Sequence, residues 1–305
     1  MTETFILCPG QGSQHVGMGK AWFDQYPVAK QTFAAADEAL GLKLSDLCFD
    51  GPEDELNRTD VAQAAIYTAS VACYQALIEM DRIGQPSAVA GLSLGEFTAL
   101  HLAGAMSFAD GLKLVRLRGQ AMQDAADAAE PSTMVALTGT ADEEAINALC
   151  DKAREDGVLV PANFNSPMQT VLSGTTAACE RAAAVAADHG LKATLLTVAG
   201  AFHSPIMQPA ADRLAAALDE VEWRTPHCPV IANVTAEPHA DDPASIKRRL
   251  VEQLTSPVRW SQSMQAAAKD YAGFAFHELA PGKVLSGLMR RIDKSIKVTN
   301  HAEPS

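Results

Sequence analysis

Positive charge is scarce in this chain of 305 residues, which has 24 Lys and Arg against 37 Asp and Glu and a formal net charge of -13. Nucleic-acid binders neutralise phosphates with an excess of basic residues on one face. The charge balance therefore argues against such a function, and we expect no nucleic acid among the partners. An acidic partner has to find a local basic surface, for which the candidates are Lys247 to Arg249 and the segment from Arg290 to Lys297.

Clustered metal ligands and long hydrophobic runs are also missing. The six cysteines are widely spaced without a C-x-x-C pair, so we expect neither a metal site nor a disulfide framework, and a reducing compartment fits best. The first residues, MTETFILCPGQG, include an acid at position 3 and only a short apolar run, which is unlike a signal peptide. Because no run of about 18 apolar residues follows, the sequence predicts a cytoplasmic protein without a membrane partner.

The order of apolar segments indicates an α/β core. A buried strand is predicted at 5–8, a long helix at 61–80, a second short strand at 87–91 and another helix at 94–102. Such an order is typical of parallel sheets. The glycine-rich segment 10–20 lacks the third glycine of a dinucleotide-binding motif and the lysine of a phosphate-binding loop, so we reject both motifs.

The middle of the chain has a different order of predicted strands and helices. Strands and helices there are predicted in the order βαββαβ, which is the order of a ferredoxin-like unit. The predicted elements are 134–140, 141–154, 158–163, 170–173, 175–189 and 193–198. The sequence therefore predicts an α/β protein with a parallel-sheet core, residues 1–130 and 200–305, interrupted by a ferredoxin-like subdomain at 131–199.

The stretch AVAGLSLGEFTAL, residues 88–100, places Ser93 between two glycines where a predicted strand gives way to a helix. One interpretation is a capping box, S-x-x-E, completed by Glu96. The other is the nucleophile elbow G-x-S-x-G, in which small flanking residues let strand and helix approach closely. Gly95 in the first helical turn costs about 1 kcal/mol relative to alanine, and a capping box does not need Gly91. The glycines therefore favour a nucleophile, beside helix N–H groups suited to an oxyanion.

A serine nucleophile needs a base, and the chain has eight histidines. His101 lies eight residues along the same helix, about 12 Å away at 1.5 Å per residue, so we expect it to pack. His203 precedes Ser204-Pro205, a plausible helix cap and start, and is the candidate base, with a structural histidine as the alternative. His15 lies in the first glycine-rich loop, within reach of the site. For the remaining histidines a solvated or structural role is the default: His189, His227, His239, His277 and His301.

Seven motifs follow one another over nearly the whole chain: PGQGSQHVGMG (9–19), AGLSLGEF (90–97), VRLRGQAM (115–122), ANFNSPMQTVLSG (162–174), GAFHSPIM (200–207), EQLTSPVRW (252–260) and ELAPGKVLSGL (278–288). In this order they resemble the malonyl-CoA:acyl carrier protein transacylase family of bacterial fatty-acid synthesis. The resemblance implies a hydrolase-like α/β core with a ferredoxin-like insertion. It also implies transfer of a malonyl group from malonyl-CoA to acyl carrier protein through a malonyl-serine, without a bound cofactor or metal. A stand-alone polyketide-type acyltransferase and a serine acyl hydrolase are the alternatives.

The resemblance also assigns roles to individual positions. Ser93 matches the acylated nucleophile and His203 the base that activates it. The backbone N–H groups of Gln11 and Leu94 match the oxyanion hole, and Gln253 matches the residue that orients the histidine. No metal ligand is implied.

Three further positions concern the substrate. Arg118 matches the arginine that binds the free carboxylate of the malonyl group, for which a guanidinium offers two parallel donors; without the resemblance it would be a solvated helix residue. The family commonly has histidine where Leu92 stands, which changes the polarity of the pocket beside the nucleophile. Phe202 resembles the residue of malonyl-selective members whose ring limits branching at the acyl α-carbon, the alternative being an ordinary core phenylalanine.

Overall fold

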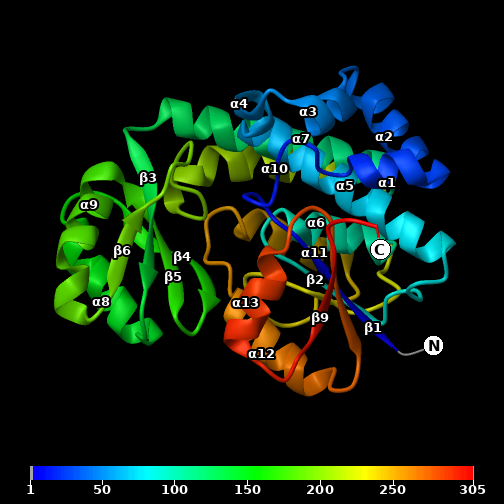
Figure 1. Cartoon of the computed structure of the whole chain (residues 1–305). Coiled ribbons are helices and arrows are strands. Elements are labelled where there is room, and N and C mark those ends of the chain that lie inside the picture. The colour runs from blue at the N-terminus through cyan, green and yellow to red at the C-terminus, as the bar shows by residue number, and fades with distance from the viewer. Residues whose placement is uncertain (1–2, 305) are drawn as a thin grey trace.

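The computed structural model describes residues 3–304, and in these residues the chain is a mixed α/β protein with two separate sheets (Figure 1). The larger sheet is entirely parallel, in the order β7-β2-β1-β8-β9. The predicted fold class, a parallel-sheet core with a smaller βαββαβ unit, is confirmed. The strands of the large sheet are β1 (Thr4–Cys8), β2 (Ala88–Gly91), β7 (Val230–Ile231), β8 (Ala275–Leu279) and β9 (Val298–His301).

Helices cover both faces of the large sheet, because successive side chains of a strand point to opposite faces. Along β1, Ile6 and Cys8 pack into the larger apolar cluster, whereas Phe5 and Leu7 pack into a second one on the other face. Helices on the first face are α1 (Lys20–Gln25), α2 (Pro27–Leu40), α3 (Leu44–Asp50), α4 (Glu53–Leu56), α5 (Thr59–Glu79), α6 (Gly95–Leu102), α7 (Phe108–Ala128), α10 (Gln208–Asp219) and α11 (Pro243–Glu252). On the second are α12 (Trp260–Asp270) and α13 (Val284–Ile292).

Helix α5 is long and apolar enough to cross a membrane by length and composition alone, with a mean hydropathy of 1.3. However, 89% of that apolar window is buried inside the protein. Its residues belong to the larger apolar cluster, so α5 is a central helix of the core. It lies above the parallel sheet in Figure 1.

The smaller sheet is antiparallel, in the order β4-β5-β3-β6. One face packs against its own two helices through Val135, Leu137 and Leu172. The opposite face contributes Met134 and Val171 to the larger cluster, so this unit turns its open face toward the rest of the molecule. Its elements are β3 (Ser132–Thr138), α8 (Glu143–Arg154), β4 (Leu159–Ser166), β5 (Gln169–Thr175), α9 (Thr176–Val185), the 3-10 turn η1 (Ala186–His189) and β6 (Lys192–Leu195).

The observed elements differ from the predicted ones mainly at their ends. The last strand of the small sheet, for example, stops at 195 instead of 198. All strands of the small sheet lie between 132 and 195. We retain the division into residues 1–130 with 200–305 and residues 131–199 as a proposal, and call these parts the large unit and the small unit.

Candidate active site

The turn that carries Ser93 joins the end of β2 to the start of α6. Ser93 has a φ of 51°, in the left-handed region that costs a non-glycine residue on the order of 1 kcal/mol. The flanking glycines allow a very close approach of backbones. A Cβ on Gly91 would lie 1.9 Å from the carbonyl carbon of Gly95, and one on Gly95 would lie 2.1 Å from the carbonyl oxygen of Cys8. These are the features of a nucleophile elbow.

The alternative capping box does not form. The N-cap of α6 is Leu94, which receives no side-chain cap. The Oγ of Ser93 lies 2.8 Å from Nε2 of His203, and the carboxylate of Glu96 is turned toward His239. The Ser93 hydroxyl is therefore available for chemistry.

A fixed junction presents His203 to Ser93, which lies 110 residues earlier in the chain. His203 has a φ of 56° and precedes the 3-10 turn η2 (Pro205–Met207). The hydroxyl of Ser204 donates to the carbonyl of Ala201 at 2.6 Å and accepts from the N–H of Ile206 at 3.3 Å. This cap, which the sequence predicts, fixes the backbone on both sides of the histidine.

The hydrogen bonds of His203 settle which ring nitrogen carries the proton. Its Nδ1 lies 2.7 Å from the backbone carbonyl of Gln253, and a carbonyl only accepts, so Nδ1–H is the donor. The lone pair of Nε2 is then free to accept the hydroxyl proton of Ser93. Burial, together with the nearby charge of Arg118, lowers the pKa of His203 to about 4. The imidazole is therefore neutral at pH 7 and able to act as a base.

Gln253, the C-cap residue of α11, is in contact with the base, as a residue that orients the histidine has to be. Its main chain, and not its side chain, contacts His203. The side-chain amide instead accepts from Nη2 of Arg118 at 2.8 Å and donates to the backbone carbonyl of Ser93 at 3.0 Å and to Glu96 at 2.6 Å. The side chain thus connects three other groups of the site.

Arg118 is 1% exposed, so the interpretation as a solvated helix residue is wrong. Its Nη1 donates to Oε1 of Gln63 at 2.8 Å, and its Nη2 donates to Oγ of Ser93 at 3.0 Å and to Oε1 of Gln253 at 2.8 Å. Its Nε has no hydrogen-bond partner within residues 3–304. Burial lowers the pKa of Arg118 to about 10, against the opposing effect of the Glu96 charge. The guanidinium is a cation beside the nucleophile with donor capacity to spare.

The two backbone N–H groups predicted for the oxyanion hole belong to residues close to the nucleophile. Leu94 directly follows Ser93, and Gln11 belongs to the loop after β1 and lines the same cavity as Ser93. In the described part of the chain, neither N–H donates to a protein acceptor. Both are therefore available to a substrate oxygen, and the oxyanion role stays a prediction.

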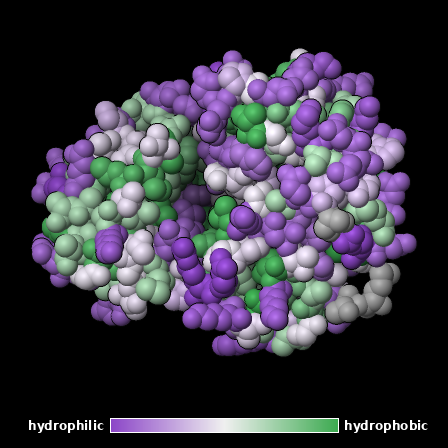
Figure 2. Space-filling model, viewed as in Figure 1, coloured by the Kyte–Doolittle hydropathy of each residue, from purple (hydrophilic) through white to green (hydrophobic). Residues whose placement is uncertain are grey.

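A cavity of about 740 Å³ opens above Ser93 and His203. Figure 2 shows the surface hollowed between the small unit, at the left, and the rest of the molecule. Both predicted pocket residues, Leu92 and Phe202, line the cavity. The apolar part of its lining includes Leu92, Met122 and Phe202 from the large unit and Met134, Val171, Leu196 and Val198 from the small unit.

Metal-ligating side chains do not gather at this cavity. Within residues 3–304, no group of three or more His, Cys, Asp and Glu side chains is arranged to hold a metal ion. All six cysteines are free and buried, and burial is the main cause that raises the thiol pKa values of Cys48, Cys73, Cys150, Cys179 and Cys228.

Comparison with known proteins agrees with this geometry. Residues 4–302 match the family described as "Acyl transferase domain". The chain belongs to this acyl transferase family. A malonyl CoA-acyl carrier protein transacylase of Bacillus subtilis (strain 168) is 42% identical over 306 residues, which cover 100% of this chain and 95% of the relative. The crystal structure of an acyl carrier protein S-malonyltransferase from Vibrio cholerae is 42% identical with a TM-score of 0.92, covering 99% of this chain and 98% of the other.

A further solved structure contains two proteins, a type II PKS acyl-carrier protein in complex with its malonyl-transacylase. The matching chain of that structure is 36% identical to this chain, with a TM-score of 0.93, and the match covers 99% of this chain and 97% of the other. The match extends over nearly the full length in each case. The resemblance deduced from the seven sequence motifs is therefore confirmed at the level of the family.

The sequence motifs did not reveal four buried side chains of this acyl transferase. Asn233 holds the elbow, because its Oδ1 accepts from the N–H of Ser93 at 2.6 Å and its Nδ2 donates to the carbonyl of Gly91 at 2.7 Å. Gln63 contacts Arg118, and Glu96 contacts His239. A glutamate or glutamine within an otherwise apolar helix is the signal that points to Glu96 and Gln63. No comparable signal marks the other two.

Proposed function

We propose that this acyl transferase moves a malonyl group from malonyl-CoA to the phosphopantetheine thiol of acyl carrier protein, for fatty-acid biosynthesis, through a malonyl ester of Ser93. The observation that carries the proposal is the buried guanidinium of Arg118, whose Nη2 lies 3.0 Å from the Ser93 hydroxyl. An uncharged acyl group gives such a cation no partner, whereas a malonyl group carries a carboxylate. The names of the relatives support the same substrate and partner.

The first half of the reaction forms the malonyl ester. Nε2 of His203 takes the hydroxyl proton of Ser93 as Oγ attacks the thioester carbonyl carbon. The carbonyl oxygen becomes an oxyanion, which the N–H groups of Gln11 and Leu94 stabilise. The C–S bond then breaks, and the leaving sulfur of CoA takes the proton from His203.

The second half reverses these steps with a different thiol. The phosphopantetheine thiol gives its proton to Nε2 of His203, and its sulfur attacks the ester carbonyl carbon. The bond to Oγ of Ser93 breaks, and the serine recovers the proton from His203. No metal or bound cofactor takes part in this scheme.

Arg118 serves binding in both halves. The malonyl carboxylate replaces water with charge-assisted hydrogen bonds from the guanidinium, each worth about 1.5–3 kcal/mol. Because the guanidinium is already fixed by Gln63 and Gln253, little ordering is needed when the carboxylate binds. We further propose that Phe202 restricts the space at the acyl α-carbon, since its side chain lines the cavity next to His203.

The position of the carrier protein and the location in the cell remain proposals. Of the predicted basic surface, Lys247 contacts Asp219 at 2.8 Å and Arg249 donates to the carbonyl of Pro238 at 2.9 Å. Arg290 and Arg291 at the end of α13 are exposed, so we favour α13 as the docking surface for an acidic carrier. Six buried free thiols support a reducing compartment such as the cytoplasm.

Intact-mass spectrometry of the wild-type enzyme mixed with malonyl-CoA tests the proposal. We expect a malonyl adduct on Ser93 that is lost when phosphopantetheinylated carrier protein is added, with the malonyl group recovered on the carrier. Loss of the adduct to water at the same rate without carrier would instead indicate a serine acyl hydrolase. A polyketide carrier accepted far better than a fatty-acid carrier would indicate a polyketide-type acyltransferase.

A further inference from the structure

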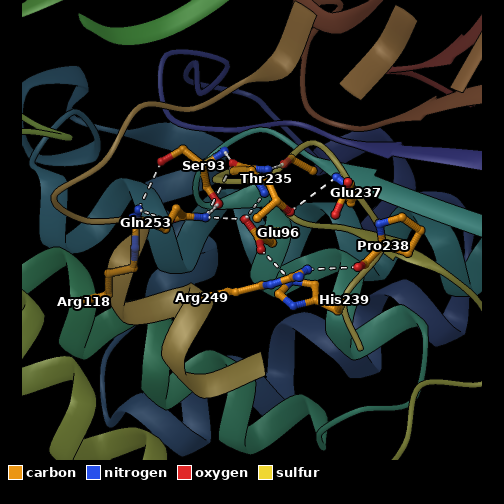
Figure 3. A network of polar contacts seen from close by, with 11 residues as sticks. Ser93, Glu96, Arg118, Thr235, Glu237, Pro238, His239, Arg249 and Gln253 are labelled. Atoms are coloured by element: carbon orange, nitrogen blue, oxygen red, sulfur yellow. Dashed lines mark hydrogen bonds and ion pairs between the residues drawn. The ribbon is translucent and has the colours of Figure 1, made fainter. Parts of the chain in front are cut away.

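A carboxylate lies beneath the elbow, and the mechanism above does not use it. Glu96 is 0% exposed and sits three residues beyond Ser93. Its Oε1 lies 2.6 Å from Nε2 of His239, while its Oε2 accepts from Nε2 of Gln253 at 2.6 Å and from the N–H of Asn233 at 3.1 Å. Figure 3 shows Gln253 between Arg118 and Glu96, with His239 on the far side of the carboxylate.

His239 is placed for this contact by the loop that follows β7. Its N–H donates to the carbonyl of Val230 at 2.8 Å, and Nη1 of Arg249 donates to the carbonyl of the preceding Pro238 at 2.9 Å. Its Nδ1 has no hydrogen-bond partner among the residues described. The imidazole of His239 thus makes its polar contact with Glu96. It contacts one oxygen of that carboxylate, and Gln253 contacts the other.

The direction of the hydrogen bonds shows what the carboxylate does. An ionised carboxylate only accepts and a guanidinium only donates, and the amide of Gln253 lies between the two. The amide NH2 must therefore face Glu96, which leaves Oε1 to face Arg118. A reversed amide would set its oxygen against a carboxylate and its NH2 against a guanidinium.

We propose that Glu96 is a positioning residue: its buried carboxylate, held by His239, fixes the orientation of the Gln253 amide and thereby aims the Arg118 guanidinium at the acyl group on Ser93. This inference rests on the proposed function, in which Arg118 binds the malonyl carboxylate. Glu96 acts through the other groups and does not touch the substrate.

The arrangement also explains how a buried cation stays available to a substrate. A carboxylate in direct contact with Arg118 would compete with the malonyl carboxylate for the same donors. Glu96 is one amide away, because Gln253 separates the two charges. At that distance Glu96 still favours the protonated guanidinium against the effect of burial, and the Nε of Arg118 is left without a hydrogen-bond partner among residues 3–304.

The test compares acylation by malonyl-CoA and acetyl-CoA in Glu96→Gln, which keeps the shape and removes the charge. An amide at 96 can donate as well as accept, so it no longer enforces the direction of the Gln253 amide, which is then held by the Ser93 carbonyl and Arg118. We expect the rate with malonyl-CoA to fall about 10-fold and the rate with acetyl-CoA to change less than about 3-fold. An unchanged ratio of the two rates, or an equal fall in both, would overturn the inference.

The matched control is Glu278→Gln. Glu278 is also 0% exposed, and it accepts from the backbone N–H groups of Leu285 and Ser286 at 2.8 Å each. Its replacement removes an equally buried charge that has no connection to Arg118, so the ratio of rates must stay at the wild-type value. A second pair tests the histidine. His239→Leu should lower the ratio, and His239→Gln, which restores a donor toward Glu96, should recover it; identical ratios in the two variants would contradict the role of His239.

Two measurements separate this inference from the proposed function. In an Arg118→Ala background, Glu96→Gln should cause no further change in the ratio, because both act through one group. A crystal structure of Glu96→Gln should show the guanidinium beyond hydrogen-bonding distance of Oγ of Ser93, and an unmoved guanidinium would overturn the inference whichever acyl group is used. If Arg118→Ala alone leaves the ratio unchanged, the proposed function of Arg118 fails while the crystallographic result still stands.

Discussion

The two units meet at one cavity but are built differently. In the large unit, Arg118, Glu96 and Gln253 are at most 1% exposed, and they are connected by hydrogen bonds to one another and to Ser93. The small unit is held by an apolar cluster between its sheet and its helices, and it faces the cavity with side chains such as Val171. A network of buried polar groups depends on every partner, whereas an apolar wall depends mainly on volume. Substitutions in the large unit should therefore change the chemistry, and those in the small unit should change little beyond stability.

The largest contrast is expected from His203→Ala. Without the base, the Ser93 hydroxyl loses the proton acceptor that it contacts in the described part of the chain, and acylation by either malonyl-CoA or acetyl-CoA should fall by at least about 10⁴-fold. Rapid-quench sampling followed by intact-mass spectrometry measures this rate. A loss below about 10-fold would mean that another group removes the proton, and the comparison between units would lose its main support.

Arg118→Ala should come next. Two to three charge-assisted hydrogen bonds to the malonyl carboxylate disappear, so kcat/KM for malonyl-CoA should fall by about 100-fold or more while that for acetyl-CoA changes by less than about 5-fold. The readout is the ratio of the two values measured on the same preparation. Equal losses would show that the guanidinium serves the nucleophile and not the carboxylate.

Two residues that line the cavity, one from each unit, test the comparison between the units further. Phe202 and Val171 line the cavity from the two units and are 7% and 6% exposed. Phe202→Ala should raise the use of methylmalonyl-CoA relative to malonyl-CoA by about 10-fold, whereas Val171→Ala should leave that ratio within about 2-fold and cost about 1–3 kcal/mol of stability. A change of selectivity in Val171→Ala as large as in Phe202→Ala would erase the distinction between the walls.

The smallest effect concerns pH. Since burial and Arg118 lower the pKa of His203 to about 4, the base stays neutral, and the rate of acylation by acetyl-CoA should stay flat from pH 8 down to about pH 5. Burial is the larger cause, so Arg118→Gln should raise the pKa of His203 only part of the way toward its ordinary value, and the acid side of the profile should move upward. A wild-type midpoint near 6.5, or a variant shifted downward, would contradict this account.

Local patterns in the sequence predict the architecture well. The glycines around Ser93 indicate a close approach of backbones that any other residue would block. The alternation of predicted strands and helices between 132 and 195 predicts the small sheet. The helices between residues 20 and 56, together with α12 and β9, were not predicted. Their boundaries depend on packing against distant parts of the chain, which short apolar segments do not reveal.

The site was predictable only in part, because most of its contacts join distant segments. The residues alone single out His203 as the candidate base but leave a structural histidine as the alternative, because nothing local shows that it meets Ser93, 110 residues earlier. The spacing offers Glu96 a place in a capping box as one of two interpretations, and it does not show that the partners of Glu96 are His239 and Gln253, 143 and 157 residues away. Burial of Arg118 could not be deduced either, because a basic residue within a helix is ordinarily solvated.

The bond from His203 to the main chain of residue 253 has a consequence for how this enzyme can change over generations. Every amino acid supplies the same carbonyl, so no point substitution at 253 by itself deprives the base of its acceptor. A substitution at residue 253 is instead expected to change the acyl preference, while the hydrogen bond from Nδ1–H of His203 to the main-chain carbonyl is kept. Substitutions at residue 253 therefore keep the acceptor for the Nδ1–H of His203 while they remove the side-chain bonds to Arg118, Glu96 and the Ser93 carbonyl.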